Sequence, residues 1–266
     1  MKLTLALLTA IGGAQADPIL FSIGADGLGV PRQLFQIDVG AANVTPLALL
    51  GDGSLSYGGG LAYRTGSTFD GLETDSFGSV NRVSYTSAGA VSNIAAAGSF
   101  SGGGMANVGG TVHWIANDFL GNSTLTTSVT ANSIGTGFNG GLAYRSTDGL
   151  AYAVQNDGNG NSSVHSVNLT TFATTQVLSL GQGFLGGLAW DPATDTFYVI
   201  GSDSNGASSL FRFVLGDTSP TSLFALGNGF NAASLTIAAA DQGVPEPSSF
   251  LLCAAVLSVR LFKRRA

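Results

Sequence analysis

Cysteine is almost absent from this sequence. The 266 residues contain a single cysteine, Cys253, in a short apolar run near the C-terminus. Residues 17–243 can therefore form neither a disulfide nor a thiolate metal site, and packing and backbone hydrogen bonds must stabilise them. Charged residues are also few, at 10% of the chain against about 25% in an average soluble protein. With 39 glycines, this composition is typical of an exported, β-rich protein with many turns.

Basic residues are especially scarce in residues 17–243. This part of the chain holds no lysine and five arginines, against fifteen Asp or Glu residues. A surface with that balance repels phosphate backbones and anionic lipid head groups. The composition therefore argues against nucleic acid as a partner.

Histidine is nearly absent as well. His113 and His165 are the only two, and they fall at non-equivalent places in the repeat described below. No third imidazole or thiol supports a zinc site, and no spacing indicates a Ser–His–Asp arrangement. We therefore assign no catalytic residue and expect no cofactor.

The N-terminus has the three parts of a secretory signal peptide. Lys2 supplies the positive charge, Leu3 to Ile11 form a short apolar segment, and Ala14 and Ala16 form a small-x-small cleavage site. Cleavage after Ala16 would leave Asp17 as the first mature residue. The sequence thus predicts a signal peptide over residues 1–16 and export of the remainder.

The last twenty-three residues, Val244 to Ala266, form a distinct tail. Two prolines hold its start extended and non-helical. An apolar run begins at Phe250, and as a helix its thirteen residues would span about 20 Å, short of the roughly 30 Å hydrocarbon core of a bilayer. The basic end would remain in the cytoplasm. The tail therefore predicts a short membrane segment suited to temporary anchoring.

The order of elements in the tail resembles the PEP-CTERM sorting signal of bacterial exported proteins. A Pro-Glu-Pro triplet, a hydrophobic segment and a terminal basic cluster carry this resemblance, which covers residues 244–266 alone. It implies processing by an exosortase, a membrane-embedded cysteine protease-like enzyme, and an association with extracellular polysaccharide. The alternative is a plain C-terminal anchor. The residues of the implied sorting signal are Val244, Pro245, Glu246, Pro247, Arg260, Lys263, Arg264 and Arg265.

Two short motifs recur through residues 17–243. The first reads GLAYR, GMANV, GLAYR, GLAWD and SLTIA, starting at Gly60, Gly104, Gly141, Gly187 and Ser234, at intervals of 37 to 47 residues. The second is Asp-x-x-Gly, which starts at Asp26, Asp75, Asp118, Asp157 and Asp203. Where a copy of each occurs in order, the Asp follows the second residue of the first motif by 13 to 15 residues. Two series in register predict a structural repeat.

Each unit of this repeat contains four short β-prone runs separated by turn residues. Four strands within 40–47 residues predict a β-propeller blade. Residues 234–240 supply only a first strand, whereas residues 19–51 supply strands two to four. The two ends should therefore complete one blade. We predict an all-β, five-bladed β-propeller over residues 17–243, closed by a C-terminal strand and flanked by the signal peptide and, in residues 244–266, a hydrophobic helix.

Two sets of residues are candidate sites. Asp and Gly at the ends of the Asp-x-x-Gly turns are what a type I turn prefers, which favours a structural role. Calcium needs six to eight oxygen ligands, so Asp157, in the oxygen-rich turn 156–163, is only a weak metal candidate. Arg64, Arg145 and Asp191 follow copies of the first motif. They are candidates for one mouth of the central channel, which first strands usually line, and the alternative is that they are solvated turn residues.

The favoured function is a non-enzymatic binding or structural component of the outer envelope or extracellular matrix. The alternative is a carbohydrate-active hydrolase that uses the channel. Hydrolysis of this kind needs an acid–base pair, commonly including Glu, and residues 17–243 contain one Glu, Glu73. Two channel carboxylates about 5–10 Å apart would favour the hydrolase. An apolar or Gly-lined channel would favour the binding protein.

Overall fold

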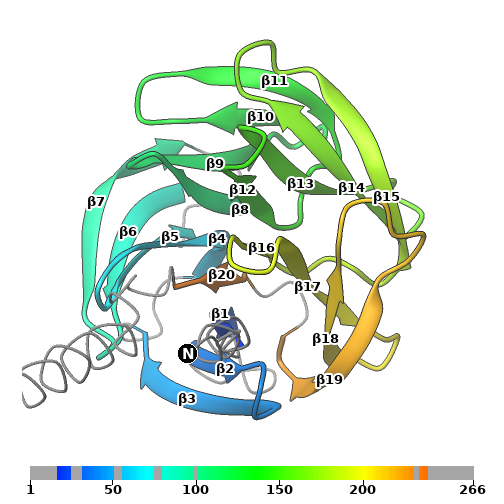
Figure 1. The fold of residues 1–266 in the computed structure, drawn as a ribbon. Helices are drawn as coiled ribbons and strands as arrows, with labels where there is room; N and C mark the ends of the chain where they lie inside the picture. The colour runs from blue at the N-terminus through cyan, green and yellow to red at the C-terminus, as the bar shows by residue number, and fades with distance from the viewer. Residues whose placement is uncertain are drawn as a thin grey trace, which may run out of the picture.

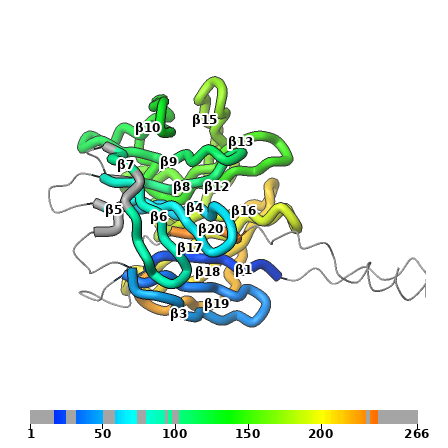
Figure 2. Tube along the Cα trace, turned by 90° about the vertical axis from the view of Figure 1, so that its left-hand side faces the viewer, coloured from blue at the N-terminus to red at the C-terminus, as the bar shows by residue number. Residues whose placement is uncertain are grey.

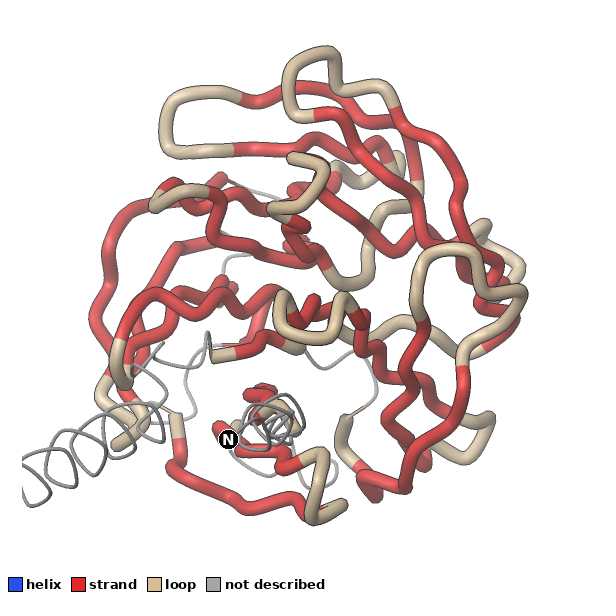
Figure 3. Tube along the Cα trace, in the orientation of Figure 1, coloured by secondary structure: helices blue, strands red, loops and turns tan. Residues whose placement is uncertain are grey.

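The computed structural model describes residues 17–24, 32–50, 56–74, 80–98, 101–230 and 234–238. These residues form five four-stranded antiparallel sheets arranged as a ring (Figure 1). Only loops and turns join the strands within the described segments, and no described helix could cross a bilayer (Figure 3). The predicted signal peptide and the whole tail lie outside the described residues. The predicted five-bladed β-propeller is confirmed.

The blades are named here in ring order. Blade 1 contains β20 (Thr236–Ile237), β1 (Ile19–Gly24), β2 (Gln33–Asp38) and β3 (Asn43–Leu49). Blade 2 contains β4 (Ser56–Thr65), β5 (Thr68–Thr74), β6 (Val80–Thr86) and β7 (Val91–Gly98). Blade 3 contains β8 (Ser101–Val108), β9 (Thr111–Asn117), β10 (Asn122–Thr126) and β11 (Ala131–Thr136). Blade 4 contains β12 (Leu142–Arg145), β13 (Leu150–Asn156), β14 (Asn161–Asn168) and β15 (Thr174–Gln182). Blade 5 contains β16 (Leu188–Asp191), β17 (Thr196–Ser202), β18 (Ala207–Phe213) and β19 (Thr221–Asn228).

Blade 1 is assembled from both ends of the described chain, as predicted. In the β1–β20 pair, Leu20 lies opposite Ile237 and Phe21 opposite Thr236. The Ser22 hydroxyl donates to the backbone carbonyl of Ser234 at 2.6 Å. On its other side β20 lies beside β4, which closes the ring (Figures 1 and 2). A single two-residue strand, β20, therefore closes the ring by pairing with β1 and lying beside β4. We call this closure the seam of the ring.

The apolar core is divided into five clusters, one between each pair of neighbouring blades. Between blades 4 and 5, the ring of Phe197 packs on Tyr152 at a centroid distance of 4.8 Å and stacks on Phe213 at 5.1 Å. Between blades 5 and 1, Leu235 is 2% exposed and packs with Leu20. Each sheet is thus covered on both faces by its neighbours, and no blade has a core of its own.

The first residue of the first motif is glycine because consecutive inner strands approach each other very closely. A Cβ atom added to Gly104, Gly141 or Gly187 would lie 1.9–2.0 Å from a backbone nitrogen of the next inner strand. In the fifth copy Ser234 takes the place of glycine, and its hydroxyl accepts the N–H of Ile23 at 3.3 Å. This end of the channel narrows to a cavity of about 20 Å³ lined largely by glycine.

Candidate functional site

The Asp-x-x-Gly turns that begin at Asp118, Asp157 and Asp203 lie within the described residues. In each turn, one carboxylate oxygen accepts the backbone N–H groups two and four residues later, at 2.8–3.1 Å. The glycine that ends each turn has a φ between 80° and 92°, which favours glycine. These aspartates therefore close their own turns. The turns that begin at Asp26 and Asp75 lie outside the described residues.

Asp157, the weak metal candidate, is engaged at both carboxylate oxygens. Its Oδ1 accepts two backbone N–H groups, and its Oδ2 accepts the Asn161 side-chain amide at 2.9 Å. The Asn161 amide, followed by the backbone N–H groups, holds the pKa of Asp157 below its ordinary value. Donors aimed at a carboxylate occupy the positions a cation would need. Across the described segments, no three His, Cys, Asp or Glu side chains cluster as a metal site.

The two histidines lie on different blades and different strands. His113 on β9 has its Nδ1 3.2 Å from the Thr111 carbonyl oxygen. His165 on β14 has its Nε2 3.0 Å from the Ser163 hydroxyl and packs its ring edge-on to Phe138. Burial lowers the pKa of both imidazoles. Both side chains are engaged with their own blade or its neighbour.

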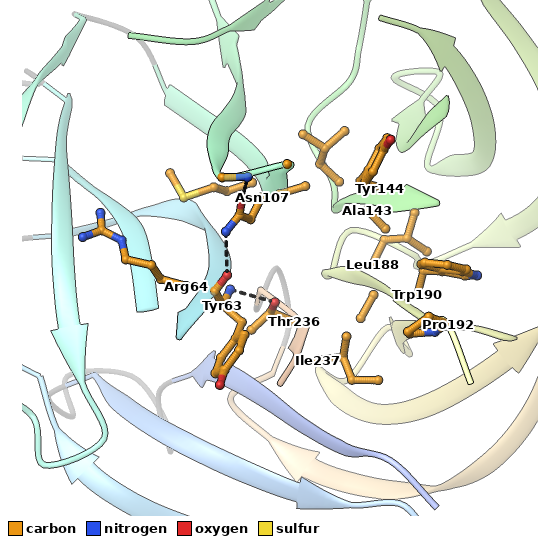
Figure 4. Close-up of a pocket in the computed structure, with 16 residues that line it drawn as sticks. Tyr63, Arg64, Asn107, Ala143, Tyr144, Leu188, Trp190, Pro192, Thr236 and Ile237 are labelled. Atoms are coloured by element: carbon orange, nitrogen blue, oxygen red, sulfur yellow. Dashed lines mark hydrogen bonds between the residues drawn. The ribbon is translucent and has the colours of Figure 1, made fainter. Parts of the chain in front are cut away.

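The channel widens at the other end into a cavity of about 370 Å³, which we call the mouth (Figure 4). All five inner strands contribute to it, and from each the fourth residue of the first motif lines the cavity. Two hydrogen bonds link the inner strand of blade 2 to the inner strands on either side of it. The Asn107 amide of blade 3 donates to the Tyr63 carbonyl at 3.4 Å, and the Tyr63 N–H donates to the Thr236 hydroxyl of blade 1 at 3.1 Å. The five fourth-position residues are Tyr63, Asn107, Tyr144, Trp190 and Ile237.

Among the described residues that line the mouth, Arg64 alone carries a charged side chain. Its guanidinium binds the fully buried Asp70 on β5, with Nη2 2.6 Å from Oδ1 and Nε 3.2 Å from Oδ2. The Arg64 side chain itself is 41% exposed. The pair fixes the guanidinium at the rim and neutralises its charge, so the mouth is close to uncharged.

Arg145 and Asp191 are not among the residues that line the mouth. Arg145 binds Asp195 of blade 5 through Nε at 2.7 Å and Nη2 at 2.6 Å, and binds Asp148 of its own blade. Asp195 also accepts the indole N–H of Trp190 at 2.9 Å, so this network holds Trp190 in place. Arg145 first, and then Trp190, lowers the pKa of Asp195 to about 2.

Asp191 shapes the turn that follows β16. It is 4% exposed and accepts the Ala193 N–H at 3.0 Å and the Thr194 hydroxyl at 2.7 Å. These bonds fix the turn 192–195, which carries Pro192 to the rim of the mouth and Asp195 to Arg145. Asp191 thus fixes the position of Pro192 at the rim of the mouth without lining the mouth itself.

Comparisons with known proteins show the fold of this chain. No family model and no curated protein matches it. One chain of the nidogen/laminin complex matches with a TM-score of 0.52 at 11% identity, covering 83% of this chain and 98% of that one. The SapL1 lectin in complex with α-methyl fucoside matches with a TM-score of 0.52 at 8% identity, covering 79% and 82%. Bacteroides ovatus Xyloglucan PUL GH43B matches with a TM-score of 0.53 at 9% identity, covering 78% of this chain and 54% of that one. At these identities the likeness extends to the fold alone.

The aromatic side chains of the mouth are the residues that sequence reasoning missed. Tyr63, Tyr144 and Trp190 each stand one position before a residue that the sequence had marked as a mouth candidate. The fourth position of the motif would have identified them. Side chains alternate along a strand, so a buried second residue implies a fourth residue on the same face, where the strand emerges from the core.

Proposed function

We propose that this protein is an exported, non-enzymatic binding propeller whose channel mouth holds an uncharged glycan. The observation that carries the proposal is the lining of the mouth. Tyr63, Tyr144, Trp190, Asn107 and the neutralised Arg64 are among the residues that line a cavity of about 370 Å³, in which Trp190 is 6% exposed. Small-molecule sites are mostly apolar with a few convergent polar groups. Pyranose rings offer apolar C–H faces to such aromatic walls and hydroxyls to the amide of Asn107.

The hydrolase interpretation has weaker support from the geometry. Glycoside hydrolysis uses two carboxyl groups about 5–10 Å apart at the scissile bond. Among the described residues that line either end of the channel, none is Asp or Glu. Asp70 lies behind Arg64, and Glu73 is buried on β5, where it accepts the Tyr85 hydroxyl at 2.8 Å. The same fold is found in a lectin and in a GH43B protein, so the fold does not choose between the two functions.

Export and sorting form the second part of the proposal. The predicted signal peptide supports export, and the tail that resembles the PEP-CTERM signal supports processing by an exosortase-type enzyme. The protein would be held briefly in the membrane and then released to the outer envelope or the extracellular matrix. Extracellular polysaccharide would be its partner there.

Glycan binding at the mouth can be tested on a glycan array, followed by calorimetry with the best ligand. Tyr144→Ala removes one aromatic wall and should weaken binding by about tenfold or more, as loss of a buried aromatic contact commonly does. Phe119→Ala is the matched control, because Phe119 is 89% exposed and lies outside the lining of the mouth. Release of reducing sugar by the wild-type protein would favour the hydrolase. An array without any ligand, or binding unchanged in Tyr144→Ala, would contradict the proposal.

Sorting can be tested separately in the native host. Replacing Pro245, Glu246 and Pro247 with alanine leaves the apolar run and the basic cluster of the tail unchanged, so membrane insertion should persist while processing fails. The full-length precursor should then accumulate in the membrane fraction. Mass spectrometry of the mature wild-type C-terminus decides the point, because a protein that still ends in Arg265-Ala266 would have a plain anchor.

A further inference from the structure

A second large cavity, of about 360 Å³, lies between blades 4 and 5. We call it the inter-blade pocket. Gln182 at the end of β15 and Phe184, which follows β15, form one wall, and residues of β17, β18 and β19 form most of the rest. Because β17 begins beside the mouth, where Phe197 pairs with Trp190, its far end at Ser202 places this pocket at the opposite end of the blade. The inter-blade pocket is therefore separate from the mouth.

Blade 4 shows one way in which the corresponding crevice is filled. Equivalent residues in blades 4 and 5 differ by 46 in number, as Leu142 and Leu188 do. In blade 4, the Gln155 side chain crosses the crevice and donates to the Thr136 carbonyl at 2.8 Å. In blade 5, the position of Gln155 is taken by Gly201, which has no side chain to reach across.

Two aromatic rings, Phe184 and Phe211, line the inter-blade pocket beside Gly201. A Cβ atom on Gly201 would lie 2.7 Å from Phe184 and 3.0 Å from Phe211, so both rings pack against the glycine. The two rings meet edge to face at a centroid distance of 4.9 Å. Phe184 is buried, whereas Phe211 is half-buried and faces the cavity. Blade 4 has His165 in place of Phe211.

Blade 5 also leaves polar groups uncommitted around these rings. In blade 4, the Oδ2 atom of Asp157 accepts the Asn161 amide, and Ser163 pairs with His165. In blade 5, Ala207 replaces the asparagine and Phe211 replaces the histidine. Within the described part of the chain, the Asp203 Oδ2 atom, the Ser209 hydroxyl and the Gln182 amide accordingly make no hydrogen bond.

These differences between blades 4 and 5 all face one cavity. A glycine lets two phenylalanine rings pack against the backbone, Phe211 supplies an apolar face, and Ala207 and Phe211 leave a carboxylate oxygen and a hydroxyl without the partners that blade 4 provides. We propose that the inter-blade pocket binds one pyranose residue of a neutral glycan. The C–H face of the sugar would pack on the Phe211 ring, and Asp203 Oδ2 would accept hydrogen bonds from its hydroxyl groups. Ser209 and Gln182 would form hydrogen bonds with its remaining oxygens.

This site does not depend on the function proposed for the mouth. With both sites occupied, one chain would hold two glycan segments at opposite ends of the ring. Such a bivalent protein gains avidity for a polysaccharide that can reach both sites.

The experiment uses one variant that copies blade 4 into blade 5 and one that alters the Asp203 carboxylate. Ala207→Asn restores the partner that blades 3 and 4 give their turn aspartate, at 2.7 and 2.9 Å. Asp203→Asn keeps the oxygen that closes the turn and changes only the second oxygen into a donor. Asn161→Ala and Asp157→Asn are the matched controls in blade 4. The probes are methyl glycosides of neutral hexoses and deoxyhexoses, titrated into the purified protein and followed by ligand-observed NMR.

The expected result is a methyl glycoside whose affinity falls about 10- to 100-fold in Ala207→Asn and Asp203→Asn, the loss typical of a hydrogen bond to a charged group. The blade 4 controls and Tyr144→Ala should bind it as the wild type does. Ala207→Asn should also melt with the wild type, since blade 4 carries an asparagine at the equivalent position. Binding that ignores the two blade 5 variants but is lost in Tyr144→Ala would place the sugar at the mouth and overturn this proposal. The absence of any bound glycoside would overturn it too.

Discussion

Replacing Gly187 with alanine should place a methyl group where the next inner strand already lies. Its Cβ atom would stand 1.9 Å from the backbone nitrogen of Leu235 and 2.5 Å from the Leu235 Cβ. Ordinary contact begins at 3.4 Å, so β16 and β20 would have to separate by about 1.5 Å. Because β20 is paired with β1 through two residues only, the strand that must move is the seam of the ring.

Overpacking a close-packed interior commonly costs about 1–3 kcal/mol, and a backbone neighbour that cannot rotate away puts this change at the upper end. For a domain of this size, about 3 kcal/mol corresponds to a fall in melting temperature of roughly 6–12 °C. Thermal unfolding followed by circular dichroism measures it directly.

Gly109→Ala separates steric contact from backbone strain. Gly109 has a φ of +56° and nothing within 4 Å of an added Cβ, so only the left-handed backbone is disfavoured, by about 1–2 kcal/mol. Gly187 has no such φ, and its cost is steric. If the two variants melted at the same temperature, the close approach of the inner strands would be refuted.

Three further outcomes follow from contacts described above. Arg145→Ala should lower the free energy of unfolding by about 1–2 kcal/mol, because it removes a 17%-exposed guanidinium that joins blades 4 and 5, and an unchanged urea midpoint would contradict that link. The pKa of Asp195 is lowered from 3.8 to about 2, so the stabilisation by its carboxylate is present above pH 3.8 and is lost as the pH falls towards 2. The stability of Asp195→Asn should not show this loss between pH 3.8 and 2, and identical stability–pH profiles for the variant and the wild type would contradict the prediction. Chelation by EDTA should leave the melting temperature unchanged, because the described Asp turns are closed by their own backbone, whereas a fall that Ca²⁺ reverses and Asp157→Ala abolishes would establish a calcium site.

The ring and its closure could be predicted because both depend on local, repeated chemistry. The glycine of the first motif stands where inner strands nearly touch in four of its five copies, and the Asp-x-x-Gly turn joins the second and third strands of blades 3, 4 and 5. The missing first strand at one end and the single extra strand at the other predicted that the two ends share one blade, and in the structure Leu20 lies opposite Ile237. The expected strand over residues 234–240 is shorter in the structure, at Thr236–Ile237.

The candidate site was harder to predict because it depends on contacts between blades. The sequence marked Arg64, Arg145 and Asp191 as equivalent, yet the first binds a buried carboxylate, the second bridges two blades and the third closes a turn. Nothing in their spacing distinguishes these roles, since the partners Asp70 and Asp195 are not part of the repeated motifs. The inter-blade pocket could not be predicted from the motifs either, for a different reason. It arises from differences between blades 4 and 5 at positions outside the two motifs, such as Ala207 in place of an asparagine, and a search for shared motifs does not detect them.

The direction of β20 has a consequence for timing. Ser234 lies at the narrow end of the channel and Ile237 lines the mouth, so the chain leaves the ring on the mouth side. The apolar run begins at Phe250, twelve Cα–Cα steps after Ala238, and this stretch reaches about 40 Å when fully extended. Under the proposed sorting route, a precursor still inserted in the bilayer would hold its mouth within that distance of the lipid surface, which restricts the access of a large polysaccharide. Cleavage of the tail would release the protein from the membrane and make its mouth accessible to polysaccharide in the same step.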